Sequence, residues 1–303
     1  GMKTSYEKKS VNYQQLSPIN FLFRTAKIFP KNIAWVYGNK KSNYEELLNR
    51  SKKLSNLIPM LGIKRKQVVT VMLPNIPAMI EAHFGIPMSG AILNTLNTRL
   101  DNKTIKYILK HSKSKLFIFH EDYKEQILNL KKENNFKIKF IIVKEPKSNT
   151  RISKSIYDYE SLMSLSKLSR NINKKYFPDN EWDSISLNYT SGTTGDPKGV
   201  LYHHRGAYLM CLNNQMVWDM GRKVIYLWTL PMFHCNGWCF PWTIVAIGGI
   251  QVCLKNIKGE NIINALHKNN INHLCGAPII LQMIISELKK LKFKRKIKII
   301  TAA

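Results

Sequence analysis

Acidic residues are scarce in this chain of 303 residues, which has 19 Asp and Glu against 47 Lys and Arg. The resulting formal net charge of +28 favours polyanions of any kind as partners, including nucleotides, nucleic acid and anionic lipid. The basic residues are spread over the whole chain, so charge alone does not choose among these partners. Even in the densest run, residues 289–298, a lysine-rich helix face and strand edge explain the pattern better than a nucleic-acid patch.

Cysteine is also scarce, and its pattern excludes a disulfide framework. The five cysteines are odd in number and all lie between Cys211 and Cys275 in apolar surroundings, as expected for reduced, buried thiols. A metal site built from His234, Cys235 and Cys239 would lack a second pair of ligands at a zinc-like spacing. The first 15 residues are polar and contain no apolar segment typical of a secretory signal, so the sequence predicts a cytoplasmic location.

Charge is missing altogether from residues 224–254, which raises the question of a membrane span. Pro231, Gly237, Pro241 and Gly248 interrupt this stretch, and its uninterrupted apolar runs are shorter than the roughly 20 residues that a span requires. We therefore expect a strand, a loop, a buried helix and a second strand here, with no membrane span.

Strand-like and helix-like segments alternate along the chain, which predicts an α/β fold of doubly wound, mostly parallel sheets with flanking helices. A polar, Ser- and Asn-rich connection at residues 144–183 suggests two subdomains. We expect a polar N-terminal segment at 1–16, a first α/β subdomain at 17–180, and a second at 181–303. The expected strands are residues 33–37, 68–73, 116–119, 138–143, 185–189, 224–229, 250–254, 273–275 and 297–300. The expected helices follow Asn43 and cover residues 76–88, 102–110, 123–132 and 159–165.

The last expected strand ends just before the chain does, at Ala303. Ligands of doubly wound sheets bind beyond the carboxyl ends of the strands, so the sequence stops where a binding loop is expected. This position predicts that the chain is an N-terminal fragment of a longer protein.

The segment richest in chemistry is residues 187–200, where a strand runs into a loop with three glycines, several hydroxyl side chains and Lys198. Glycines let main-chain N–H groups approach oxyanions closely, hydroxyls donate further hydrogen bonds, and a lysine adds a positive charge. This combination of groups is suited to binding a polyphosphate. The loop is not a Walker A motif, because no glycine stands four residues before a Gly-Lys-Ser/Thr triplet.

Residues 190–199, TSGTTGDPKG, resemble the phosphate-loop signature of the adenylate-forming superfamily, which includes acyl-CoA synthetases, peptide-synthetase adenylation domains and luciferases. Four further blocks look like those of the family, so the resemblance covers nearly the whole chain. They are NTLNTRL at 94–100, YHHRGAYL at 202–209, PMFHCNGW at 231–238 and CGAPIILQMI at 275–284. Within the family these blocks are most similar to acyl-CoA ligases of short or medium-chain carboxylic acids.

The resemblance implies an ATP- and Mg²⁺-dependent reaction in which a carboxylic acid is joined to AMP and its acyl group is then passed to coenzyme A. It implies catalytic roles for Lys198 and His234, and a metal contact at Thr190. The nucleotide-binding residues that it implies are Thr190, Ser191, Gly192, Thr193, Thr194, Gly195 and Lys198. The substrate-binding residues that it implies are His234, Asn236, Gly237, Trp238, Gly276 and Ala277.

Two alternatives remain open at the level of sequence. The same phosphate loop would serve an adenylation module that loads a carrier-protein thiol, and the blocks that bind adenine and ribose would lie beyond Ala303. A basic nucleotide- or nucleic-acid-binding module is the alternative of another class, although no helix-turn-helix, zinc-finger or RNP pattern is recognisable. The identity of the acid and the oligomeric state, including a homo-oligomer, are also left open.

Overall fold

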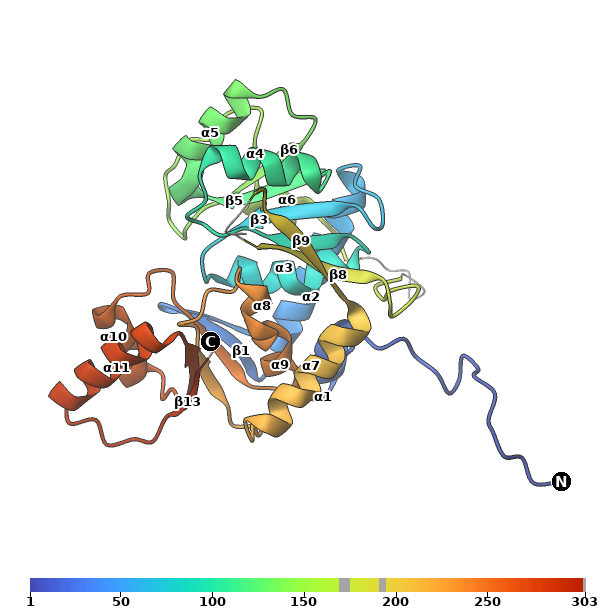
Figure 1. Cartoon of the computed structure of the whole chain (residues 1–303), viewed down its shortest axis with the longest axis vertical. Helices are drawn as coiled ribbons and strands as arrows, with labels where there is room; N and C mark the ends of the chain where they lie inside the picture. Colours follow the sequence, from blue (N-terminus) through green and yellow to red (C-terminus); the bar gives the residue numbers. More distant parts are fainter. Residues whose placement is uncertain (169–174, 191–194, 302–303) are drawn as a thin grey trace.

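The computed structural model describes residues 1–168, 175–190 and 195–301 and contains two sheets packed against helices (Figure 1). The strands are β1 Ile33–Tyr37, β2 Lys40–Asn43, β3 Val68–Met72, β4 Ile92–Thr95, β5 Leu116–His120, β6 Lys139–Val143, β7 Tyr157–Asp158, β8 Ser184–Thr190, β9 Lys198–His203, β10 Ile225–Leu227, β11 Ile250–Cys253, β12 His273–Gly276 and β13 Lys298–Thr301. The first sheet has the order β13-β12-β10-β11-β1-β2, and the second has the order β7-β6-β5-β3-β4-β8-β9.

The strands of each sheet are parallel except at one of its edges. β2 runs antiparallel to β1, and β9 runs antiparallel to β8. Every other neighbouring pair is parallel, so the predicted α/β class with mostly parallel sheets is confirmed.

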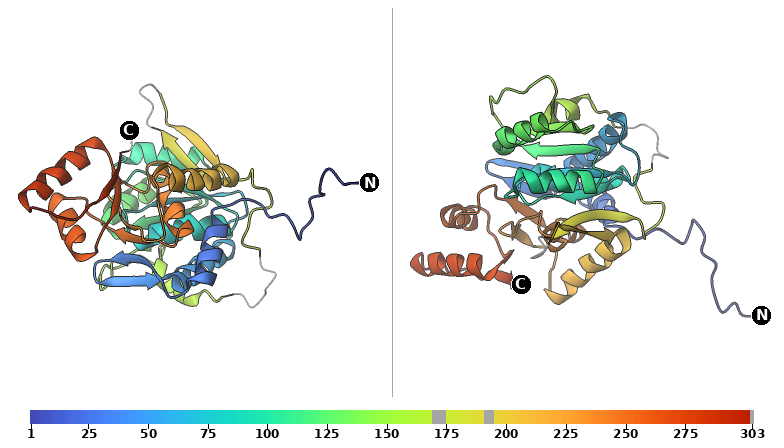
Figure 2. Two further views of the ribbon diagram at one scale, coloured as in Figure 1. Left: turned by 90° about the horizontal axis from the view of Figure 1, so that it is seen from below. Right: turned by 45° about the horizontal axis from the view of Figure 1, so that its top comes forward.

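Helices cover both faces of the two sheets. They are α1 Ile19–Ile28, α2 Tyr44–Met60, α3 Pro77–Met88, α4 Asn102–His111, α5 Lys124–Glu133, α6 Tyr159–Leu165, α7 His204–Val217, α8 Cys235–Trp238, α9 Phe240–Ala246, α10 Gly259–Lys268 and α11 Pro278–Lys290, with a 3₁₀ turn at Glu121–Tyr123. The largest core lies between the sheets, around α1, α2, α3 and α9. Separate cores join α4 and α5 to one outer face, and α10 and α11 to the other (Figures 1 and 2).

α3 is the central helix of this arrangement. Every residue from Ala78 to Met88 is buried, because the helix lies between the two sheets and contacts α1, α2 and α9. Its sequence is apolar on all sides except at Glu81 and His83. Charged and polar side chains that are fully buried need partners, so these two residues mark places where the interior has been built around a polar group.

The two sheets do not follow the division expected at residue 180. β1 and β2 come from the first part of the chain but pair with β11, whereas β8 and β9 follow residue 180 and pair with β4. The pairing partners of a strand are long-range choices that local periodicity does not encode. The expected strand positions are otherwise matched, but β2, β4, β7 and β9 were missed because they are short or adjoin a turn or loop.

Residues 1–14 are exposed and extend away from the body (Figure 2). None of the helices in the described ranges is long and apolar enough to cross a membrane. The uncharged stretch at residues 224–254 forms β10, α8, α9 and β11. All five cysteines are free, and four of them are buried.

Candidate active site

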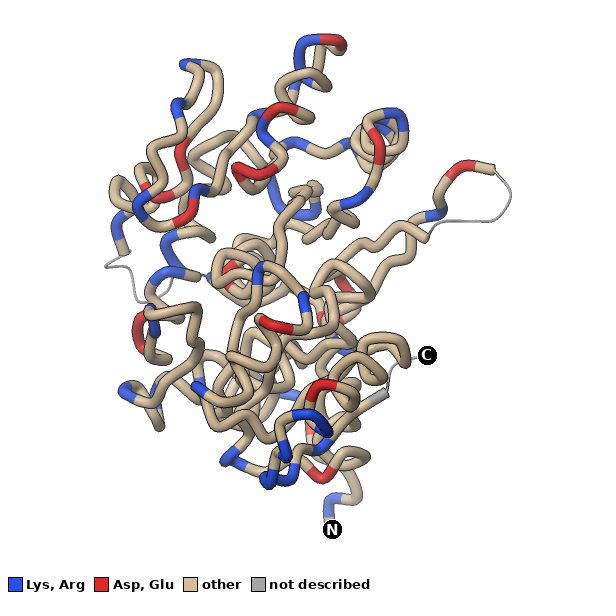
Figure 3. Tube along the Cα trace, turned by 90° about the vertical axis from the view of Figure 1, so that its left-hand side faces the viewer, with Lys and Arg blue, Asp and Glu red and all other residues tan. Residues whose placement is uncertain are grey.

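The two ends of the predicted phosphate loop, Thr190 and Lys198, belong to the paired strands β8 and β9, which project from the body (Figure 3). Thr190 and Lys198 are register partners at the end of the hairpin, and both are exposed. Gly195 has φ +91°, a conformation that L side chains rarely adopt. Ser191, Gly192, Thr193 and Thr194 lie outside the described residues. The structure therefore brings the ends of the predicted loop, with its lysine, to one exposed hairpin tip.

The segment Pro231–Trp238, which carries the predicted substrate residues, ends in a left-handed turn. Five consecutive residues, 235–239, have φ between 49° and 66°. Such a backbone costs roughly 1–2 kcal/mol for each residue other than glycine. Only Gly237 avoids this penalty, and a Cβ there would also lie 2.6 Å from the ring of Trp228. The exposed His234 caps this turn at its N-terminal side.

Buried side-chain amides hold this segment in place. Asn75 donates to the carbonyl of Leu230 at 2.9 Å and accepts from the main-chain N–H of Met232 at 2.9 Å. Asn214 donates to the carbonyl of Trp238 at 2.9 Å. Asn75 follows β3 of the second sheet and Asn214 lies on α7, so a loop after a strand and a helix together fix the path of residues 230–238.

A crevice of about 510 Å³ opens on one side of this segment. It is formed by the loops after β3, β4, β10, β11 and β12, which is the edge where ligands of doubly wound sheets bind. Arg99, Lys255 and Lys258 line it, and none of the described lining residues is acidic. Lys255 forms an ion pair with Asp122 at 2.9 Å. The crevice is therefore positively charged and suits an anionic ligand.

An apolar cavity of about 400 Å³ opens on the other side of the same segment. Its lining comes from β9, α7 and the left-handed turn, and consists of Leu201, Tyr202, His203, Gly206, Ala207, Met210, Cys235, Trp238 and Cys239. Phe233 lines the crevice and Cys235 lines the cavity, so His234 lies in the chain between a charged space and an apolar one. The indole Nε1 of Trp238 is buried without a hydrogen-bond partner among the described residues.

The other predicted site residues fall into two groups. Ala277 lines the crevice and directly follows Gly276, the last residue of β12. Asn236, in contrast, lines neither space. Its side chain is fully buried and bonded to Asn188 and His83, so it supports the segment from beneath.

Several residues of this region had no role in the sequence-based prediction. Asn75, His83 and Asn188 bind the segment from elements far away in the chain. A histidine within the apolar stretch 76–88 was a usable signal for His83, because a buried imidazole needs partners. Arg99 belongs to the NTLNTRL block, yet its place in the crevice depends on the pairing of β4.

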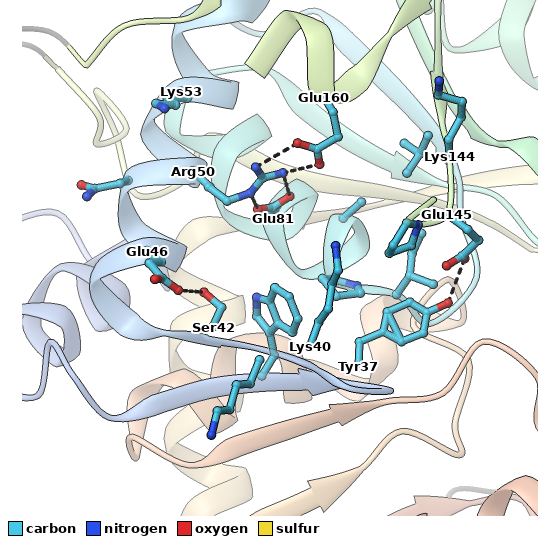
Figure 4. A pocket seen from close by; sticks show the side chains of 18 residues that line it. Tyr37, Lys40, Ser42, Glu46, Arg50, Lys53, Glu81, Lys144, Glu145 and Glu160 are labelled. Atoms are coloured by element: carbon cyan, nitrogen blue, oxygen red, sulfur yellow. Dashed lines mark hydrogen bonds and ion pairs between the residues drawn. The ribbon is translucent and has the colours of Figure 1, made fainter. Parts of the chain in front are cut away.

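A second cavity, of about 500 Å³, lies away from these residues, between the β1–β2 hairpin, α2, the start of α3 and the end of β6 (Figure 4). Arg50 of α2 lies between Glu81 of α3 and Glu160 of α6, and Tyr159 donates to Glu81 at 2.9 Å. The arginine thus ties three helices together. None of the site residues predicted from the sequence lines this cavity.

The buried histidines predict how stability depends on pH. Burial lowers the pKa of His83 to about 4, against a smaller opposing effect of its bond to Met79, and burial also lowers that of His204 to about 4. Between pH 6.5 and 4 the unfolded chain then binds more protons than the folded one, so stability falls as pH decreases. We expect each histidine to contribute a loss of up to about 3 kcal/mol over this range.

Urea unfolding of the chain at several pH values measures this effect. His83→Gln should flatten the dependence between pH 6.5 and 4, because glutamine does not titrate. An unchanged slope in His83→Gln would mean that His83 does not titrate in this window.

No group of three or more His, Cys, Asp or Glu in the described ranges could hold a metal ion. Any metal at the hairpin would depend on a hydroxyl such as that of Thr190 and on oxygens of a ligand.

Several proteins similar to this chain are named CoA ligases. It is 38% identical over 296 residues to an acetate/butyrate–CoA ligase of Arabidopsis thaliana, covering 93% of this chain and 51% of the relative. It is 40% identical over 296 residues to a trans-cinnamate:CoA ligase of Petunia hybrida, covering 92% of this chain and 51% of that protein. The chain thus spans about half the length of the relatives it matches.

Solved structures support the fold. The crystal structure of an anthranilate CoA ligase with anthranoyl-AMP matches with a TM-score of 0.78 and 18% identity, over 91% of this chain and 52% of that one. A fatty acyl CoA synthetase of Mycobacterium tuberculosis matches with a TM-score of 0.78 and 17% identity, over 95% and 55% of the two chains. At these identities the likeness concerns the fold.

The predicted cytoplasmic location is contradicted by the relatives. The Arabidopsis acetate/butyrate–CoA ligase, the Petunia trans-cinnamate ligase and an Arabidopsis benzoate–CoA ligase are all named as peroxisomal. The prediction rested on the lack of an N-terminal signal, which says nothing about other routes of import.

The family described as AMP-binding enzyme matches residues 22–301, which is nearly all of the described chain. The two mostly parallel sheets and the crevice at their carboxyl ends accompany this match, and the chain belongs to the AMP-binding enzyme family.

Proposed function

We propose that the protein containing this chain is an acyl-CoA ligase that activates a short or medium-chain carboxylic acid with ATP and transfers the acyl group to coenzyme A. The observation that carries the proposal is the pair of spaces on either side of residues 233–235. A basic crevice suits the phosphates of a nucleotide, and an apolar cavity of about 400 Å³ suits a modest acyl group. The names of the relatives favour coenzyme A over a carrier protein as the thiol, and the peroxisome as the location.

The reaction consists of two displacements. A carboxylate oxygen attacks the α-phosphorus of ATP, and the bond to pyrophosphate breaks. The thiol then attacks the acyl carbonyl carbon and loses its proton, and AMP leaves with the former carboxylate oxygen. Negative charge develops on the departing pyrophosphate, so the exposed Lys198 beside Thr190 would act by stabilising that charge.

Two further groups have roles in this proposal. His234 would lie beside the reacting carboxylate, because it lies in the chain between the lining of the crevice and that of the cavity. Among the described residues, the Thr190 hydroxyl makes one long contact, of 3.4 Å, with the carbonyl of Lys198, so its oxygen would be able to join the ligands of Mg²⁺. Bound to the phosphates, Mg²⁺ would neutralise part of their charge.

A nucleic-acid-binding function is less well supported. Basic residues are scattered along the whole trace and interspersed with acidic ones (Figure 3), and the three basic residues of the crevice line a recess. A carrier-protein-loading enzyme would share the same adenylation chemistry.

The test is acid-dependent pyrophosphate release by the protein that contains this chain, over straight-chain acids of increasing length together with benzoate and cinnamate. We expect the highest activity with an apolar acid of short or medium length, and formation of its CoA thioester. Activity confined to long-chain acids would contradict the proposed substrate, and transfer to a carrier protein instead of coenzyme A would favour the alternative.

Enlarging the apolar cavity should change the preferred acid. Trp238→Ala and Met210→Ala remove side chains that line the cavity, so longer acids should be favoured. One methylene in an apolar pocket changes relative kcat/KM by about tenfold or more. We expect the ratio of kcat/KM for a longer acid to that for the preferred acid to rise by at least about tenfold in Trp238→Ala.

Met216→Ala is the matched control, because Met216 also belongs to α7 but is exposed. Its chain-length profile should equal that of the wild type. If Trp238→Ala and Met210→Ala also kept the wild-type profile, the acyl group would have to bind elsewhere.

A further inference from the structure

The left-handed turn at residues 235–239 has an unusual amount of buried polar support. Asn188 of β8 donates from Nδ2 to Oδ1 of Asn236 at 2.8 Å. The Nδ2 of Asn236 lies 3.2 Å from Nε2 of His83, in the middle of α3. A single side chain of the turn therefore joins β8, which leads into the phosphate loop, to the central helix.

The directions of these hydrogen bonds are fixed by chemistry. Nδ1 of His83 lies 2.7 Å from the carbonyl of Met79, which can only accept, so Nδ1 carries the proton. Nε2 of the neutral ring is then an acceptor, and Asn236 donates to it. Asn236 in turn accepts from Asn188. Every donor in this series therefore faces an acceptor. Burial lowers the pKa of His83 and so keeps its ring in the neutral form.

The chain of bonds continues on the other side of Asn188. Its Oδ1 lies 3.0 Å from the hydroxyl of Thr95, at the end of β4, and the same hydroxyl lies 3.0 Å from the carbonyl of Phe233. Thr95 can donate its one proton to either acceptor. Both sides of His234 in the chain, Phe233 and Asn236, are thus bonded to one connected set of buried side chains.

We infer that Asn188, Asn236 and His83 form a positioning clamp that holds the left-handed turn and thereby fixes His234 and Trp238 relative to the bound acid. The inference deepens the proposed function and rests on it. The three residues touch no substrate; they act through the turn. A backbone that is unfavourable at four non-glycine positions persists only when its surroundings determine it, and such positions are typical of functional sites.

Ordinary core packing is the competing explanation. Packing needs no directional bonds, and an apolar residue in place of His83 would avoid burying an imidazole. The clamp instead connects β8 and α3 by directional hydrogen bonds, and both bonds are made by Asn236. Among the non-glycine residues of the turn, asparagine is the type that tolerates a positive φ best. Packing predicts a loss of stability on substitution, whereas positioning also predicts a selective loss of kcat.

The experiment compares kcat and KM in acid-dependent pyrophosphate release for wild type, Asn236→Ala, His83→Phe and His83→Gln in the protein that contains this chain. We expect Asn236→Ala and His83→Phe to lower kcat by about tenfold to a hundredfold, because misplacing a reacting group by about 1 Å has effects of this size. The KM for ATP should stay within about twofold of the wild type. His83→Gln should recover most of kcat, because the glutamine amide can accept from Asn236.

His204→Phe is the matched control. His204 is equally buried, and its Nδ1 lies 2.7 Å from the Ser17 hydroxyl, but it does not contact the turn through a hydrogen bond. We expect the His204→Phe variant to have a lower free energy of unfolding than the wild type and the same kcat. The clamp is overturned if kcat of Asn236→Ala and His83→Phe stays within twofold of the wild type. It is also overturned if kcat of His204→Phe falls as much as kcat of those two variants.

Amide hydrogen exchange of the 303-residue chain gives a second readout that does not need activity. Amides of residues 233–239 should be protected in wild type and His204→Phe and exchange at least about tenfold faster in His83→Phe. If the wild type released no pyrophosphate with any acid, the proposed function would fail. In that case equal protection in wild type and His83→Phe would overturn the clamp as well, while selective loss of protection would support its structural part.

Discussion

Lys198→Ala is expected to lower acid-dependent pyrophosphate release by about a hundredfold to a thousandfold, the usual effect of removing one group that stabilises developing charge. Lys198 begins β9 at the tip of the exposed hairpin and faces solvent. Its removal should therefore leave the free energy of unfolding within about 0.5 kcal/mol of the wild type. The measurement is pyrophosphate release at saturating acid and ATP, with urea unfolding of the same preparations.

Lys110→Ala provides the control for loss of a surface charge. Lys110 is exposed on α4, on the outer face of the second sheet. This variant should match the wild type in both measurements. If Lys198→Ala released pyrophosphate as fast as the wild type, the assignment of the hairpin as the phosphate loop would be wrong.

Arg50→Ala is expected to lower the free energy of unfolding by about 3–5 kcal/mol, because it leaves the carboxylate of Glu81 buried without a counter-charge. The Glu81 side chain is 2% exposed and accepts from two nitrogens of Arg50 (Figure 4). Tyr159 also donates to it, but a phenol does not neutralise a charge. Chemical denaturation of the chain measures the loss.

Glu160→Gln shows whether the loss of stability comes from the buried carboxylate or from the loss of any ion pair of Arg50. Glu160 accepts from the same guanidinium at 2.7 and 3.1 Å, but its side chain is 62% exposed. An exposed pair contributes at most about 1 kcal/mol, so this variant should be nearly as stable as the wild type. Adding Glu81→Gln to Arg50→Ala should recover most of the loss. Equal losses for Arg50→Ala and Glu160→Gln would contradict the account of a buried charge.

Local sequence signals were sufficient for most of the strands and for several helices. The apolar runs at residues 68–73 and 116–119 became β3 and β5, and Asn43 caps α2 with a capping box, as its side chain and Glu46 predict. The TSGTTGDPKG pattern and the strand before it predict a phosphate loop, and this remains a prediction, whereas the returning strand β9 was not expected. These features depend on residues close together in the chain.

Hydrogen bonds between residues far apart in the sequence could not be predicted from local sequence signals. Asn188 belongs to the same strand as the phosphate loop, but its bond to Asn236 depends on how β8 approaches the turn. His83 and Asn75 contact the segment Pro231–Trp238 across more than 150 positions of sequence. The left-handed turn was not predicted either, because Cys235, Trp238 and Cys239 are not residue types that signal a positive φ.

Transfer of oxygen from the acid to AMP is the most direct sign that the acid is activated through an acyl-adenylate. The acid is supplied with both carboxylate oxygens as ¹⁸O, together with ATP, Mg²⁺ and coenzyme A, and the phosphate-containing products are analysed by mass spectrometry. The account predicts one ¹⁸O in AMP for each thioester formed and none in pyrophosphate. Label in orthophosphate together with ADP would show activation through an acyl phosphate and would contradict the account.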